Sequence, residues 1–192
     1  TPLIQALSSN SDVGIEDYKF FSFDKTDGLK RTNFIYHRSA YLDHQNRLWW
    51  GPGDGLTMLD LKQFQLPVDP PRTTLKSISI EQTFVDYQRL RDTAYQYSIP
   101  FGAKLAQAVD SVARFNNYPL NLALPYDLNH LTFQFSAIDW AAPHKLKYSY
   151  QMEGLEEQWS LPTSSNEADY RSVPPGDYIF KVKAMGSAQV WS

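Results

Sequence analysis

The stretch HLTFQFSAI, residues 130–138, alternates apolar and polar side chains over the length of one β-strand. A period of two with one polar face indicates an antiparallel sheet that packs on one side and meets water on the other. The apolar face comprises Leu131, Phe133, Phe135 and Ala137, and the polar face Thr132, Gln134 and Ser136. This stretch therefore predicts a half-buried strand.

The same alternation recurs in KLKYSYQM, residues 145–152, and in DYIFKVKA, residues 177–184. Tyr148 and Tyr150 then face the core, opposite the lysines and serine between them. In LKSISI, residues 75–80, the isoleucines share the inner face, and Ser77 and Ser79 share the outer one. Several such strands need a second sheet to cover their apolar faces, so the pattern predicts a β-sandwich.

A turn with a specific signature precedes the last of these strands. In SVPPGDYIFKVKA, residues 172–184, Pro175 and Gly176 form a turn, and Tyr178 follows two residues after the glycine. This resembles the tyrosine corner of immunoglobulin-like and fibronectin type III sandwiches, in which the phenol bonds back to the backbone. We interpret Tyr178 as a structural residue.

The first third of the chain reads as short strands separated by turns. The strand-like stretches are YKFFSF at 18–23, FIYHRSAYLD at 34–43, LWWG at 48–51 and LTMLDL at 56–61, with a glycine-rich turn, GPGDG, at 51–55. Four-stranded units of this kind build propeller blades. A proline-rich bridge, QLPVDPPRTT, follows and marks the domain boundary.

Residues 87–117 have a different texture from the strands around them. Within GAKLAQAVDSVARF, residues 102–115, Leu105, Val109, Val112 and Ala113 recur at helical spacing among good helix formers. The spacing predicts a helix of two to three turns inside an insertion.

Two parts of the chain resemble known families. The segment TDGLKRTNFIYHRSAYLDHQNRLWWGPGDGLTMLDLKQF, with Trp49, Trp50 and Gly55, looks like a two-component regulator propeller repeat. The segments LPYDLNHLTFQFSAIDWAAPHKLKYSYQMEGLEEQWS and ADYRSVPPGDYIFKVKAMG look like the Y-Y-Y domain, named for three tyrosines. The residues in register with that domain are Asn129, Phe133, Phe135, Tyr148, Tyr150, Gly154, Trp159, Pro175, Gly176, Tyr178 and Trp191.

The order of these two parts is similar to the periplasmic sensor region of hybrid two-component systems of Bacteroidetes. The resemblance implies an all-β chain: a last propeller blade with a strand of its neighbour at 1–66, a linker at 67–74, and a fibronectin III-like sandwich at 75–192. A short helical insertion occupies about 87–117, and the final sandwich strand of the family is expected to be missing.

The resemblance also implies a function. The chain would be a noncatalytic relay segment of a histidine kinase, a homodimer in the periplasm that joins through its sandwich or strand edges. It would couple oligosaccharide recognition by the propeller to a membrane helix that follows. The alternative is an accessory or carbohydrate-binding module of a carbohydrate-active enzyme.

Composition excludes other classes. A net charge of −3 without a basic run argues against nucleic acid as a partner. The absence of cysteine excludes disulfides and thiolate chemistry. No run of eighteen apolar residues occurs, and the amino end, TPLIQALSSN, has no leader pattern, so we expect an excised piece of a longer protein.

The sequence offers few candidate site residues. Trp140 and His144 lie in DWAAPHK, an expected loop, where exposed aromatics often contact a ligand or a neighbouring domain with about equal frequency. Trp49 and Trp50 could stack on a sugar, but packing is the favoured interpretation. The four histidines have no metal-ligand spacing, and adjacent Glu156 and Glu157 point apart, so we expect no metal, cofactor or catalytic site.

Overall fold

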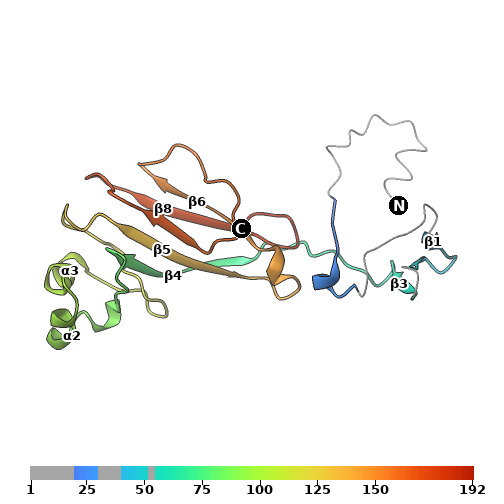
Figure 1. The fold of residues 1–192 in the computed structure, drawn as a ribbon, viewed down its shortest axis with the longest axis horizontal. Helices are drawn as coiled ribbons and strands as arrows, with labels where there is room; N and C mark the ends of the chain where they lie inside the picture. Colours follow the sequence, from blue (N-terminus) through green and yellow to red (C-terminus); the bar gives the residue numbers. More distant parts are fainter. Residues whose placement is uncertain (1–19, 30–39, 52–54) are drawn as a thin grey trace. The chain divides into compact units, whose positions relative to one another are not determined.

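The structure is a computed structural model that describes residues 20–29, 40–51 and 55–192. The chain divides into two compact units, Thr1–Gln65 and Leu66–Ser192. Figure 1 shows the described elements of each unit.

The first unit contains one antiparallel sheet. Its strands are β1 (Ala40–Leu42), β2 (Arg47–Trp50) and β3 (Thr57–Asp60), in the order β1-β2-β3. The β1–β2 turn is held by Asp43, whose carboxylate accepts hydrogen bonds from the backbone N–H groups of Gln45 and Arg47. An aspartate in this position replaces the backbone partners that a tight turn leaves unpaired.

The strand expected at 18–23 does not appear in its described part. Residues 20–24 are not assigned to a strand, because no neighbouring strand pairs with them among the described residues. A short helix, η2 (Lys25–Asp27), follows, capped by the Asp24 side chain and ended by Gly28 in the left-handed region with φ of 95°. Most of the expected strand at 34–43 and part of the GPGDG turn lie outside the described residues.

The second unit is built from two sheets. One has the order β4-β5-β7, formed by β4 (Arg72–Ile80), β5 (Leu131–Ile138) and β7 (Glu167–Tyr170). The other pairs β6 (Lys147–Glu153) with β8 (Ile179–Met185), and all of these pairings are antiparallel. Figure 1 shows the two sheets as layers, with β6 and β8 over β4 and β5.

Aromatic side chains join the two layers. Phe133 on β5 stacks on Phe180 on β8, with ring centroids 4.0 Å apart and planes 9° apart. Tyr170 meets both rings edge to face, and Tyr148 and Tyr150 pack around Phe135. Phe133, Phe135 and Tyr148 are buried, which confirms the inner faces that the alternation predicts.

The polar face of the β4-β5-β7 sheet is less exposed to solvent than the alternation predicts. Ser77, Ser79 and Thr132 were expected to meet water, but all three are buried. Their small side chains lie between longer ones on neighbouring strands. Ser77 donates to the Gln134 side chain and Thr132 to Asp169, so these hydroxyls keep hydrogen-bond partners. A β-bulge between Leu75 and Ser77 shifts the register along β4.

The insertion contains η3 (Tyr87–Arg89), α2 (Thr93–Ser98) and α3 (Gly102–Ala108). The 7 residues of α3 make about two turns, within the two to three turns predicted. The helical spacing is wrong beyond Ala108: Val109 is extended and bridges to Leu122, because a β-branched residue with a strand partner favours that backbone. Leu105 is fully buried in the same core cluster as the strands, so the insertion packs on the sandwich.

One boundary also differs from expectation. Strand β4 begins at Arg72, inside the expected linker at 67–74, and Arg72 pairs with Ile138 on β5. On β8, Trp191 bridges to Met185, and the Ser192 N–H donates to the Ala184 carbonyl. Among the described residues, no other pairing occupies this side of β8.

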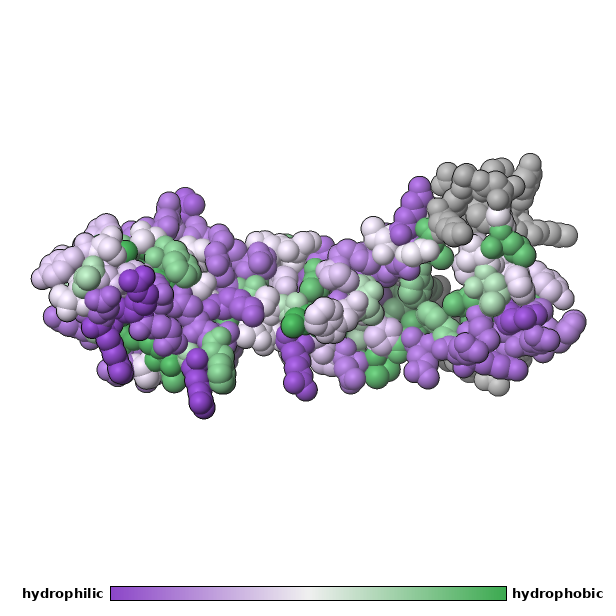
Figure 2. All heavy atoms as spheres, turned by 90° about the horizontal axis from the view of Figure 1, so that it is seen from below, coloured by the Kyte–Doolittle hydropathy of each residue, from purple (hydrophilic) through white to green (hydrophobic). Residues whose placement is uncertain are grey.

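The described chain is mostly β with few helices, as the sequence predicts at the level of fold class. Its helices, in the residues that the structure describes, are all too short and polar to cross a membrane. Figure 2 shows that on one face hydrophobic side chains form separate patches among hydrophilic ones. The propeller blade and the fibronectin comparison remain proposals.

The aromatic stack should carry a large part of the stability. We expect Phe133→Ala to lower the free energy of unfolding by about 3–5 kcal/mol, because it opens a cavity between the sheets. Phe115→Ala is the matched control: this ring is 87% exposed, so its loss should cost less than about 1 kcal/mol. Urea unfolding followed by circular dichroism measures both. Equal effects would contradict this account of the core.

Candidate functional site

The most constrained loop of the second unit follows β5 and begins at Asp139. One carboxylate oxygen accepts hydrogen bonds from the backbone N–H groups of Ala141 and Ala142, at 3.0 and 3.2 Å. The other oxygen accepts from the Ser187 N–H and hydroxyl, at 2.7 and 2.6 Å. Asp139 therefore ties the loop after β5 to the loop after β8.

The space around this carboxylate is filled. A side chain at Gly186 would meet an Asp139 oxygen at 2.4 Å, so glycine is required for the close approach. Burial acts to raise the pKa of Asp139, but the hydrogen bonds from Ser187, Ala142 and Ala141 outweigh it and lower the pKa below its usual value. The carboxylate is held ionised by its donors.

Trp140 follows this aspartate and points into solvent. Its side chain is 91% exposed, although the backbone on either side is fixed by Asp139 and by buried Ala142. Trp140 is the most exposed of the large hydrophobic side chains among the described residues, and its loop backbone is held by hydrogen bonds. This combination is typical of a contact surface.

Trp140 borders a pocket of about 370 Å³. The pocket lies entirely within the second unit, between the proline-rich stretch, the first residue of β4 and the loops after β5 and β8. Its lining residues are Pro67, Asp69, Pro70, Pro71, Arg72, Ile138, Asp139, Trp140 and Ser187.

Two charged side chains at this pocket remain available. Arg72 and Asp69 are both exposed, and neither has an ion pair within the described ranges. Arg72 sits opposite Ile138 in the β4–β5 register, which places its side chain at the end of the sheet. The site thus offers an aromatic face, a planar cation and a carboxylate.

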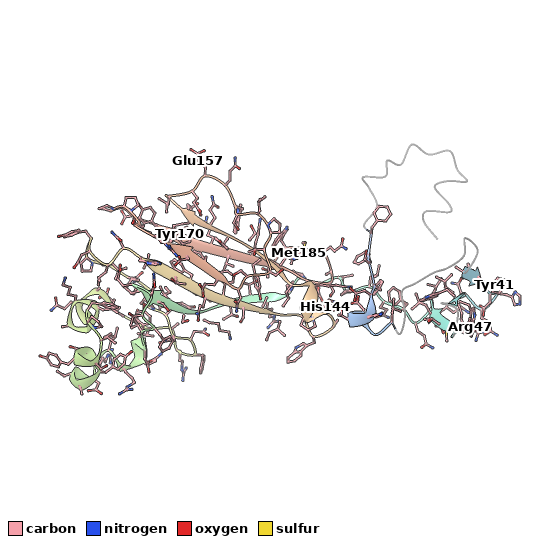
Figure 3. The ribbon with its side chains drawn as sticks, viewed as in Figure 1. Tyr41, Arg47, His144, Glu157, Tyr170 and Met185 are labelled. Carbon is pink, nitrogen blue, oxygen red and sulfur yellow. The ribbon has the colours of Figure 1, made fainter. Side chains whose placement is uncertain are left out.

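His144, the other predicted candidate, is not part of this pocket. It lies on η4 (Pro143–Lys145), where it is exposed. Figure 3 shows the position of His144 among the side chains of the second unit. The structure therefore separates the two candidates: Trp140 lines a pocket, and His144 does not. Sequence reasoning missed Asp139 and Arg72; the one available signal was an aspartate placed to bond N–H groups two and three residues ahead.

The predicted structural residues of the Y-Y-Y pattern surround the core. Tyr148 is buried, and its hydroxyl accepts from the Ala137 N–H at 3.1 Å. The Tyr178 hydroxyl donates to the Pro174 carbonyl at 2.9 Å, so the corner has the predicted bond back to the backbone. A side chain at Gly176 would meet that hydroxyl at 2.7 Å, which requires glycine there.

Other members of the pattern fix loops. The Asn129 side-chain amide donates to the Tyr126 backbone carbonyl, and the Asn129 backbone carbonyl accepts from the Val173 N–H. Tyr150 is half-buried among aromatic rings, and Pro175 is exposed at the corner. Each of these contacts is a structural one.

Trp159 belongs to a closed aromatic contact. The Lys183 ammonium lies 4.0 Å from the centroid of the Trp159 ring and 5.1 Å from that of Trp191. The Lys183 ammonium makes a cation–π contact with both rings, so the chain itself supplies the cation at the Trp159 ring.

In the first unit, Trp49 and Trp50 are both half-buried on β2. The Trp49 indole N–H donates to Asp43, and the Arg47 guanidinium lies over the same ring at 5.2 Å. Partial desolvation acts to raise the pKa of Asp43. The hydrogen bonds from Arg47 and Trp49 outweigh it, so the pKa lies well below its usual range. Gly55 is exposed, and a side chain at this position would meet no atom within 4 Å, so its packing does not require glycine.

A second polar cluster lies where β5 and β7 meet. Asp169 accepts from the His130 ring at 2.6 Å, from Thr132 at 2.8 Å and from Arg171 at 2.9 Å. The His130 and Arg171 contacts lower the pKa of Asp169 to about 2. Histidine and hydroxyl bind the same carboxylate oxygen, so the histidine does not stand between them as a general base would.

The paired acids are also separated by the fold. Glu156 accepts from the Met152 N–H and from the Tyr170 hydroxyl, a contact that, together with burial, raises the pKa of Tyr170. Glu157 is exposed, and Figure 3 shows it on the loop after β6, pointing away from the sheets. Glu156 therefore stabilises the fold through its hydrogen bonds, whereas the Glu157 side chain is exposed to solvent.

Comparisons with known proteins show what the chain is similar to in sequence and structure. The Y_Y_Y domain model matches residues 141–192. Over 189 residues, 97% of this chain, the sequence is 25% identical to histidine kinase P4 of Formosa agariphila, and the match spans 12% of that protein. The extracellular domain of a hybrid two component system from B. thetaiotaomicron is similar in structure, with a TM-score of 0.55, 19% identity and coverage of 90% of this chain and 20% of that one.

These matches confirm the resemblance drawn from the sequence. The chain is similar to the sensor regions of two-component systems, and the structural likeness shows that it shares their mostly β fold. Residues 141–192 are the part that matches the Y_Y_Y domain. The chain spans a small fraction of the length of both relatives.

The Asp139 contacts predict an effect on stability. Asp139→Asn places an amide against the Ser187 donors, and we expect a loss of about 1–3 kcal/mol of unfolding free energy at neutral pH. Ser187→Ala, which removes the one hydroxyl contact and keeps the three backbone N–H donors, should cost less. Thermal unfolding of both variants measures the difference, and an unchanged Asn variant would contradict the role of Asp139.

The same carboxylate predicts a pH dependence. The folded pKa is lowered, so its contribution is fully present above the unfolded value of about 3.9 and is lost as pH falls through the folded value. The unfolding temperature of the parent chain should therefore approach that of Asp139→Asn below about pH 4. A difference in unfolding temperature between the parent chain and Asp139→Asn that stays constant down to about pH 3 would contradict the prediction.

Proposed function

We propose that this chain is a noncatalytic extracytoplasmic sensor and relay segment of a hybrid two-component histidine kinase. The observation that carries the proposal is the match of residues 141–192 to the Y_Y_Y domain. The similarity of nearly the whole chain to a histidine kinase supports the kinase context. The likeness to an extracellular domain supports a periplasmic location.

The proposal includes coupling between the two units. The chain leads from the first unit through residues 66–71 into β4, the strand that pairs with β5, and we propose this as the route of the signal. The second unit suits this role because its core is continuous from the strands to the insertion, and dense cores move as rigid bodies. Oligosaccharide recognition outside this segment would supply the signal.

The proposal also includes a homodimer. The open side of β8 offers unpaired backbone groups beside Trp191, within the described part of the chain. Phe180 and Val182 face inward on this strand yet are half-exposed, which is typical of a sheet edge that lacks a neighbour. A second copy is the partner that the resemblance implies.

The alternative, an accessory module of a carbohydrate-active enzyme, rests on the sandwich fold alone. The kinase context favours the sensor. The gene that encodes the chain separates the two: a kinase module supports the sensor, and a glycosidase module supports the alternative.

The relay makes a direct prediction. A short Gly-Ser insertion between Gln65 and Leu66, at the boundary of the two units, should abolish ligand-dependent output of the full-length kinase in a reporter strain. The same insertion in the exposed loop at 164–166 is the control and should leave output intact. Unchanged signalling with the boundary insertion would overturn the relay.

The dimer can be tested in the isolated chain by sedimentation equilibrium. We expect self-association that Ile179→Lys weakens by about tenfold, because a charge on an edge strand opposes edge pairing. Leu161→Lys, at a residue that is 87% exposed on a loop, is the matched control and should not change association. A monomer at high concentration would contradict the proposed dimer.

A further inference from the structure

We infer that the pocket beside Trp140 is a binding subsite for an acidic saccharide, a sugar ring that carries a carboxylate. The inference rests on the proposed sensor function and adds a ligand contact within this chain. Nothing in the family match or the related proteins assigns ligand binding to these residues.

The first step is the fixed aromatic face. Trp140 is 91% exposed, whereas the preceding Asp139 holds its loop through hydrogen bonds to Ala141, Ala142 and Ser187. The backbone that carries the ring therefore loses little conformational freedom when a ligand binds. The face of an indole ring is negative, and it attracts the slightly positive C–H groups on the apolar face of a pyranose.

The second step is the cation. Arg72 lines the same pocket and has no carboxylate partner in the described portion of the chain. A guanidinium binds a carboxylate through two parallel hydrogen bonds, which gives both affinity and orientation. The position of Arg72 is fixed by its backbone, because β4 begins there and pairs with Ile138.

The third step is the rest of the lining. Pro67, Pro70 and Pro71 supply apolar walls with fixed φ, so the pocket is formed before a ligand arrives. Asp69 can accept hydrogen bonds from sugar hydroxyls, and the Ser187 oxygen keeps a lone pair after donating to Asp139. The volume of about 370 Å³ lies at the small end of the range for ligand pockets, as expected for one or two sugar rings.

The closed contact at Trp159 shows what distinguishes this site. There the chain supplies its own cation to two indole rings, and no partner is needed. At the pocket beside Trp140, Arg72 has no ion pair within the described ranges, and it lines the pocket together with the indole ring. Asp139 already accepts four hydrogen bonds, so the lining leaves one guanidinium and the Asp69 carboxylate open. These groups suit a ligand with an apolar face, a carboxylate for Arg72 and hydroxyl donors for Asp69.

The test is a calorimetric titration of the whole 192-residue chain. The probes are trisaccharides of galacturonate, mannuronate and glucuronate, each compared with its carboxyl-reduced counterpart. We expect at least one uronate to bind at micromolar to millimolar concentration and more tightly than its reduced form. Trp140→Ala should weaken that binding by about tenfold or more.

Arg72→Gln should remove the preference for the uronate, again by about tenfold, and leave binding of the reduced sugar nearly unchanged. The controls are Tyr97→Ala, an equally exposed aromatic on α2, and Arg91→Gln, an exposed arginine outside the pocket. Neither control should alter binding. Unfolding midpoints equal to that of the parent chain show that each variant is folded.

The inference is overturned if no uronate binds, or if binding survives Trp140→Ala unchanged. The first result would mean that Trp140 contacts a protein neighbour instead. Failure of the two proposals can be told apart: a chain that binds no sugar while the boundary insertion silences the kinase refutes only the subsite. Sugar binding with unaltered signalling refutes only the relay.

Discussion

The second unit depends on the contact between Phe133 and Phe180, which stack at 4.0 Å and join one sheet to the other. A sheet of two or three strands cannot bury its apolar face alone, so neither sheet would be stable without this layer. Phe133 lies on β5, the middle strand of its sheet, and the rings of Tyr170 and Phe135 pack around the stack. The ends of the strands, and hence the loops, take their positions from this core.

The Trp140 loop is a consequence of that arrangement. Strand β5 ends at Ile138 and β8 ends at Met185, so the packed sheets bring the loops that follow them to the same end of the unit. Asp139 can then reach Ser187 and lock the two loops together. The backbone that carries the exposed indole is thus positioned by the core.

The sequence predicts the features that follow from the spacing of apolar residues. It misses those that depend on contacts between residues far apart in the chain. Alternation identifies Phe133 and Tyr148 as core residues, because every second side chain lies on the same face of a strand and only one face of these strands is apolar. Helical spacing overextends the helix past Ala108, since the bridge between Val109 and Leu122 is invisible in the spacing. The role of Asp139 is missed for the same reason: its partner, Ser187, lies 48 residues away.

The position of the proposed subsite would link binding to relay. Its walls include Pro67 and Pro71, in the proline-rich stretch at the start of the second unit, and its cation is Arg72, the first residue of β4. A ligand held between Trp140 and Arg72 would therefore contact this stretch and the sandwich at once. Such a ligand favours whichever arrangement of that segment keeps these contacts, and it can shift the equilibrium only by the difference in its affinity between arrangements. Rigidity of the Trp140 loop makes this difference larger, because a loop that followed the ligand would bind it equally well in every arrangement.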